Sequence, residues 1–123
     1  MELKATKISY ELDNEEGLSS VFIEYDNGYF TVARMEDEEN IYIEKDDQAN
    51  GEYWERDCFE ISLRNGTFVV SMSLNNKKLL KYIEDNGLRV DLYCNTSITF
   101  EPISTEDFMK LSSVVKRIFS INQ

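Results

Sequence analysis

The sequence contains no histidine, which removes the commonest general base and the commonest metal ligand of proteins. Two cysteines, Cys58 and Cys94, are too few for a structural zinc site without histidine. The five glycines are scattered and form no phosphate-binding loop. Carboxylate pairs do occur, but 24 acidic residues produce such pairs by chance. These absences predict a protein that is not an enzyme and that holds no metal and no cofactor.

Long hydrophobic runs are also absent. The longest apolar stretches, such as residues 68–70, have 3 residues, whereas a membrane helix needs about 20. The first residues, MELKATK, have neither the basic patch followed by an apolar run nor the cleavage site of a secretory signal. We therefore expect a cytoplasmic protein with reduced thiols and no membrane insertion.

The length and the hydrophobic content are those of one folded domain. A chain of 123 residues, of which 41% are hydrophobic, buries roughly two-thirds of the surface that its unfolded form exposes. It shows no internal repeat, linker or low-complexity segment. We expect residues 1–123 to form a single domain.

The acidic charge is concentrated in the first half of the chain. Residues 1–60 hold 18 acidic and 5 basic residues, a net charge of −13, whereas residues 61–123 hold 6 acidic and 8 basic residues, a net charge of +2. Negative charge repels nucleic acid and anionic lipid, and attracts a basic protein or a cation. The alternative is that the acidity only keeps the domain soluble.

Four of the five glycines follow asparagine, at 27–28, 50–51, 65–66 and 86–87. Asn-Gly is a strong signal for a two-residue hairpin turn, and such a turn fixes which residues face each other. A turn at 65–66 creates a wholly apolar face by pairing Leu63 with Phe68, Ile61 with Val70 and Phe59 with Met72. A turn at 27–28 pairs Tyr25 with Phe30 and Ile23 with Val32. Two hairpins are therefore predicted.

Further strands are predicted by the alternation at 6–12, by Ile41 and Ile43, and by the segments 88–94 and 98–101. Helical periodicity predicts one helix at about 75–86 and another at 105–119, where Ser104 and Asp107 form a capping box. Together these strands and helices predict an α+β fold. Its mainly antiparallel, hairpin-rich sheet of about six to eight strands is packed on one face by the two helices.

The acidic segment EKDDQANGEYWERD, residues 44–57, partly matches a calcium-binding EF-hand loop. Asp46 takes the first position, Gly51 the sixth and Asp57 the twelfth. Asp57 is one methylene shorter than the expected glutamate, and the flanking sequences look like strands rather than helices. Calcium would bind only weakly, at ~10⁻⁴ to 10⁻³ M. A small acidic regulatory module, either weakly calcium-binding or a DNA mimic, is the alternative function.

A tight hairpin at 50–51 would place Asp46 opposite Glu55, and such like-charge opposition is destabilising. We therefore expect a broader loop that gathers acidic and aromatic side chains for a basic partner. The predicted partner-binding residues are Asp46, Asp47, Gln48, Tyr53, Trp54, Glu55 and Asp57, with a second acidic cluster at Glu36, Asp37, Glu38 and Glu39. The alternative for Trp54 is a place in the core.

Three motifs carry a resemblance: IYIEKDDQ at 41–48, the hairpin FEISLRNGTFVVSM at 59–72, and RIF at 117–119. The segment 41–119 resembles a family of small bacterial immunity proteins, which protect cells against their own polymorphic or contact-delivered toxins. In that family a Tyr-Gly-Gly-like element follows the Asp-Gln pair, where this chain has ANGEYWERD. The resemblance implies a non-enzymatic α+β protein that blocks a cognate toxin by stoichiometric binding. Many such toxins are basic nucleases.

Overall fold

A computed structural model describes residues 2–45, 51–73, 81, 84–85 and 96–119. In chain order, its elements are β1 (Glu2–Glu11), β2 (Leu18–Tyr25), β3 (Gly28–Met35), β4 (Asn40–Lys45), β5 (Glu52–Glu55), the 3-10 helix η1 (Arg56–Cys58), β6 (Phe59–Arg64), β7 (Thr67–Met72), β8 (Thr96–Thr99) and α3 (Thr105–Phe119). The eight strands form one sheet in the order β5-β4-β3-β2-β1-β8-β7-β6. The prediction of an α+β fold with a mainly antiparallel sheet is confirmed, and among the strands that the structure describes the one parallel pair is β1 with β8.

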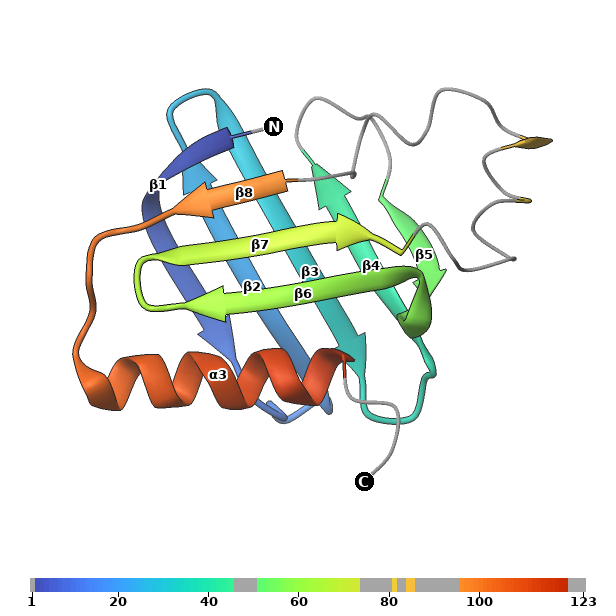
Figure 1. Cartoon of the computed structure of the whole chain (residues 1–123). Helices are drawn as coiled ribbons and strands as arrows, with labels where there is room; N and C mark the ends of the chain where they lie inside the picture. Colours follow the sequence, from blue (N-terminus) through green and yellow to red (C-terminus); the bar gives the residue numbers. More distant parts are fainter. Residues whose placement is uncertain (1, 46–50, 74–80, 82–83, 86–95, 120–123) are drawn as a thin grey trace.

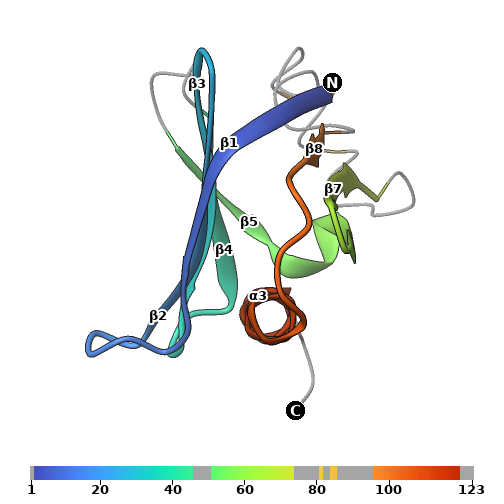
Figure 2. The same ribbon diagram turned by 90° about the vertical axis from the view of Figure 1, so that its left-hand side faces the viewer.

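The sheet folds over on itself at β1. The first residues of β1 pair with β8, and from Ala5 onward the strand pairs with β2, with a register shift between Ala5 and Lys7. Figures 1 and 2 show β1–β5 as one layer, with β7, β8 and α3 facing it across the interior. We call the covered side of β1–β5 the inner face and the opposite side the outer face.

One hydrophobic core fills the space between these layers. Alternate residues of the strands point into it, and α3 adds Leu111, Val114, Val115 and Ile118 from one side of the helix. Fully burying a side chain of this size contributes roughly 1.5–3 kcal/mol. The predicted helix at 105–119 is confirmed, and one of the two hydrogen bonds of the predicted capping box is present, since the Asp107 N–H donates to Ser104 Oγ at 3.1 Å.

The prediction of two helices packed on one face is not matched. Within the described ranges one complete α-helix is present, α3, and strands β6–β8 cover the inner face beside it. The expected helix at 75–86 lies outside the described residues, except for Lys81, Glu84 and Asp85, whose backbone is helical. The expected strand at 88–94 lies wholly outside them.

The two predicted hairpins form, but only one has the predicted register. At 65–66 the pairing is as expected, with Leu63 opposite Phe68, and Gly66 takes the positive φ of +91° that the turn requires. At the other hairpin Ile23 lies opposite Phe30, so the predicted pairing is shifted by two residues. The reason is that the turn is Asp26-Asn27 and Gly28 already belongs to β3. A shift of two leaves every side chain on its predicted face.

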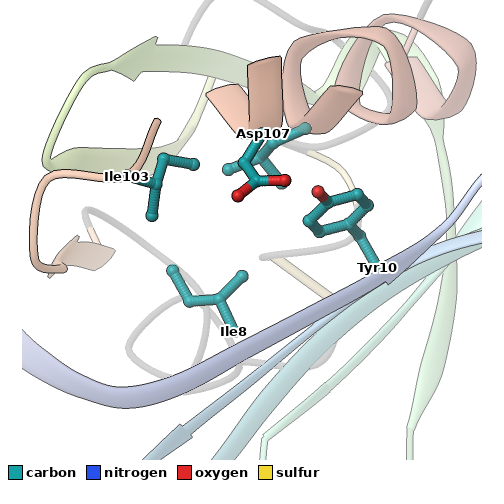
Figure 3. A pocket seen from close by; sticks show the side chains of 5 residues that line it. Ile8, Tyr10, Ile103 and Asp107 are labelled. Carbon is teal, nitrogen blue, oxygen red and sulfur yellow. The ribbon is translucent and has the colours of Figure 1, made fainter. Parts of the chain in front are cut away.

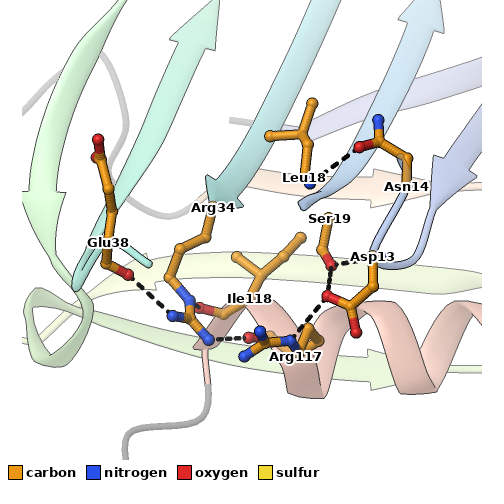
Figure 4. A network of polar contacts seen from close by, with 8 residues as sticks. All are labelled: Asp13, Asn14, Leu18, Ser19, Arg34, Glu38, Arg117 and Ile118. Atoms are coloured by element: carbon orange, nitrogen blue, oxygen red, sulfur yellow. Dashed lines mark hydrogen bonds and ion pairs between the residues drawn. The ribbon is translucent and has the colours of Figure 1, made fainter. Parts of the chain in front are cut away.

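A buried arginine ties the sheet to the end of α3 (Figure 4). Arg34, on β3, is 7% exposed and donates hydrogen bonds to the carbonyl oxygens of Ile118 at 3.0 Å, Arg117 at 2.5 Å and Glu38 at 2.9 Å. Two of these carbonyls belong to the last turn of α3, where the helix dipole favours a cation. Arg34 therefore caps the helix and fixes the β3–β4 turn beside it.

Candidate functional site

An aromatic side chain from each of four adjacent strands lies on the outer face. Phe22 on β2 stacks on Tyr29 on β3, with ring centroids 5.4 Å apart and an interplanar angle of 24°. Tyr42 on β4 and Tyr53 on β5 lie opposite each other, with centroids 5.2 Å apart and rings tilted by 55°. We call these four residues the aromatic row. Its two ends reach solvent, since Phe22 is 36% exposed and Tyr53 is 64% exposed.

Glu44 lies between the two halves of the aromatic row. The Tyr29 hydroxyl donates to Glu44 Oε1, and the Tyr42 hydroxyl donates to Glu44 Oε2 at 2.5 Å. The hydrogen bond from Tyr29, and then that from Tyr42, lower the pKa of Glu44, while partial burial opposes them. The hydrogen bond to Glu44 is also the main reason why the pKa of Tyr42 rises to about 12. At neutral pH the row therefore carries a fixed negative charge near its centre.

Gly51 permits this arrangement because the Tyr42 phenol lies directly against its backbone. A Cβ atom at this position would lie 2.0 Å from Tyr42 Oη, well inside any contact distance. The sequence suggested that Gly51 serves a turn or a calcium loop. The structure assigns it a further role, which is to leave room for the phenol.

A groove of about 380 Å³ runs along the outer face beside the aromatic row. Its lining includes the aromatic Phe22, Tyr42 and Tyr53, the apolar Leu18, Ala33 and Met35, the acidic Glu38 and the otherwise buried Arg34. The groove thus joins the row to the exposed acidic turn 36–39. In the described part of β2–β5 the outward positions include Glu24, Glu44 and Glu55 but no lysine or arginine. Arg34 and Lys45 occupy inward positions of their strands and are buried, although Arg34 also contributes to the lining of the groove.

The structure brings two of the predicted partner-binding residues into this groove. Tyr53 and Glu38, which are 15 residues apart in the sequence (53 − 38), both line it. Glu36, Asp37 and Glu39 are exposed in the same β3–β4 turn as Glu38. One residue of the predicted loop cluster and one residue of the second acidic cluster therefore line the same groove.

Trp54 was predicted to belong to the partner-binding surface, but it is buried in the core. Strand register places it opposite Ile41 on the inner face, where it is 5% exposed and packs edge-on against Phe59 with ring centroids 5.5 Å apart. Neighbouring residues of a strand point to opposite sides, so Tyr53 faces the outer side and Trp54 faces the covered inner side. The core position, which was the alternative for Trp54, is the observed one.

The remaining loop residues are placed in part. Glu55 ends β5 opposite Asn40, and the exposed Asp57 lies in η1. Asp46, Asp47 and Gln48 lie outside the described residues. β4 ends at Lys45 and β5 begins at Glu52, so the loop is broader than a two-residue turn, as predicted. Both flanks are strands, which differs from the helix–loop–helix of an EF-hand.

The sequence interpretation missed Phe22, Tyr29, Tyr42 and Glu44 as site residues. The signal was present, because Tyr42 and Glu44 alternate with the buried Ile41 and Ile43 and must therefore face outward. An aromatic residue on the solvent side of a strand was the informative feature.

The described residues show neither a metal-ligand cluster nor a membrane-spanning helix. In the described ranges no three His, Cys, Asp or Glu side chains gather as metal ligands, and no described helix combines the length and apolarity needed to cross a membrane. The side chain of Cys58 is buried. Comparisons of the chain with protein-family models, curated proteins and solved structures find no match.

Proposed function

We propose that this protein is an immunity protein that neutralises a cognate bacterial toxin by stoichiometric binding, and that the outer groove docks a basic surface of that toxin. The observation that carries the proposal is the aromatic row with the ionised Glu44 at its centre, beside an open groove. The acidic first half of the chain and the resemblance of residues 41–119 to immunity proteins support the same conclusion. The protein acts by occlusion and performs no catalysis.

The groove suits a cationic, partly apolar epitope. Exposed tyrosine rings supply large contact areas with little loss of side-chain entropy, and their faces attract lysine and arginine. The exposed Tyr53 and the half-buried Tyr42 present their rings near the Glu44 carboxylate. The exposed turn 36–39 adds negative charge at the other end of the groove, which accelerates the approach of a basic partner.

Tyr53→Ala tests the aromatic contact. The substitution removes the most exposed ring of the row without touching the core, so we expect the dissociation constant to rise about 30-fold, as for a hot-spot residue. The toxin candidate is the protein encoded by the neighbouring gene, with affinity measured by calorimetry and protection measured by co-expression. Met109→Ala is the matched control, since Met109 is also 64% exposed but lies on α3.

Glu44→Gln tests the charge at the same site. It keeps the shape of the side chain while removing its negative charge, so association should slow and lose part of its salt dependence. Glu60→Gln, at an exposed position on β6, removes the same charge elsewhere. Equal behaviour of these two variants, together with full protection by the Tyr53→Ala variant, would show that the toxin docks on another surface.

A further inference from the structure

The second half of β1 has an edge that pairs with no other strand of the described chain. β1 pairs with β8 only at Glu2–Lys4, and from Ala5 to Glu11 its pairing is with β2 on one side. Figure 2 looks at the molecule from the side of this edge. An open edge presents backbone N–H and C=O groups that can pair with another strand.

Two cavities follow this edge between β1 and α3. The first, of about 240 Å³, is lined by Ile8 and Tyr10 of β1, by Ile103 and by residues of α3 (Figure 3). The second, of about 330 Å³, shares Tyr10 with the first and extends to Leu12, which is 48% exposed. The β1 side of these cavities is therefore apolar and incompletely covered, while α3 contributes the polar Asp107, Lys110 and Ser113 to their lining.

The outer side of the same edge carries alternating charge. Lys7, Ser9 and Glu11 are all exposed and point to the outer face. If a second β1 lies antiparallel beside the first with Ser9 opposite Ser9, Lys7 of each copy faces Glu11 of the other. The same register places Ile8 opposite Tyr10 twice on the inner side, next to the cavities. The edge is thus complementary to itself in charge and in apolar contacts.

We propose that two copies of the chain associate through their β1 edges, centred on Ser9, to form one continuous sheet. A two-fold axis makes both Lys7–Glu11 pairs form together, as an isologous interface requires. A register centred on Ile8 would place Lys7 opposite Ser9 and leave Glu11 without a cation. The outer groove is on β2–β5, so this interface is independent of the proposed toxin site.

Charge reversal tests the register. Sedimentation equilibrium of the wild-type chain should show a dimer at high concentration. Lys7→Glu and Glu11→Lys each create two like-charge pairs, and each should raise the dissociation constant about tenfold or more. The double variant K7E/E11K restores opposite charges and should dimerise like the wild type. An equimolar mixture of the two single variants should form a heterodimer, because one carries only acidic and the other only basic side chains at these positions.

Matched controls separate this register from net charge. Lys4→Glu and Glu2→Lys make the same charge changes at exposed positions of β1 that lie where β1 pairs with β8. These variants should dimerise as the wild type does, and thermal unfolding confirms that all variants are folded. A wild-type chain that stays monomeric up to about millimolar concentration would overturn the proposal. So would equal weakening by Lys7→Glu and Lys4→Glu, or failure of the double variant to restore the dimer.

Discussion

Glu44 and Tyr42 form the pair of residues on which the chemistry of the outer face depends. With the pKa of Tyr42 raised to about 12, its folded-state value lies above that of an unfolded tyrosine. The hydrogen bond therefore stabilises the fold fully below pH ~10, and this stabilisation is lost as the pH rises toward about 12. We expect Glu44→Gln to lower the pKa of Tyr42 toward ~10, as followed by tyrosinate absorbance. Tyr42→Phe should remove the titration step at the highest pH, and its loss would assign that step to Tyr42.

Gly51→Ala tests the close approach of the Tyr42 phenol to the backbone. The added methyl group would displace the phenol from Glu44, so the pKa of Tyr42 should fall as in Glu44→Gln. The free energy of unfolding should drop by about 1 kcal/mol, the net value of a hydrogen bond. Gly66→Ala is the control, because its cost comes from the positive φ of +91° and leaves Tyr42 untouched. Equal tyrosine titration curves for the wild type and Gly51→Ala would contradict this role of Gly51.

At this scale the sequence predicted residue types better than residue directions. Tyr53 and Trp54 were both identified as binding aromatics, yet neighbours in a strand point to opposite faces, and the inner face of this sheet is covered. The choice depends on the pairing of β5 with β4, which places Trp54 opposite Ile41. The loop between these strands is too long for turn chemistry to fix that pairing, so the direction of each side chain could not be predicted.

Arg34 is a side chain of the sheet that holds the end of α3 through the Ile118 and Arg117 carbonyls. Replacing Arg34 by Met would leave the Ile118, Arg117 and Glu38 carbonyls without their buried donor. We expect the free energy of unfolding, measured in urea, to fall by about 2–4 kcal/mol. Arg34→Lys should recover only part of this, because an ammonium group lacks the planar fork that reaches several acceptors.

Arg117→Ala provides the contrast at the same end of the helix. It removes the ion pair between Arg117 Nε and Asp13 Oδ1 at 3.0 Å, in which both side chains are partly exposed. Such a pair contributes about 1 kcal/mol or less. If Arg34→Met were no more destabilising than Arg117→Ala, the capping role of Arg34 would be wrong.

Among the elements, local signals predicted α3 and the 65–66 hairpin correctly. Both have signals within a few residues, namely the Ser104 cap with a helical apolar pattern, and an Asn-Gly turn whose register gives a wholly apolar face. At the other hairpin, Asp26-Asn27 competed with Asn27-Gly28 for the turn, and both alternatives keep the same residues buried. Burial periodicity cannot distinguish registers that differ by two.

The folding of the sheet over itself is a property of the whole molecule that no local sequence pattern predicts. It depends on the parallel pairing of Glu2 with Ser97, residues separated by 95 positions (97 − 2). A hairpin model pairs neighbours in sequence and therefore predicts a sheet that packs only against helices. Because β1 belongs to both layers, the core is closed by strands β6–β8 as well as by α3.

The uneven charge predicts opposite effects of salt on folding and on partner binding. Residues 1–60 carry a net charge of −13, and this half supplies all of β1–β5, so folding gathers like charges in one layer. Screening this repulsion should raise the free energy of unfolding in urea as ionic strength increases from low values to ~0.15 M. Over the same range, association with the proposed basic partner should slow, because salt also screens the attraction between the two proteins. Urea titrations measure the salt dependence of the free energy of unfolding, and stopped-flow experiments measure the salt dependence of the association rate. Glu38→Gln should reduce both salt dependences. An association rate that does not change with salt would contradict a basic partner, whatever the salt does to stability.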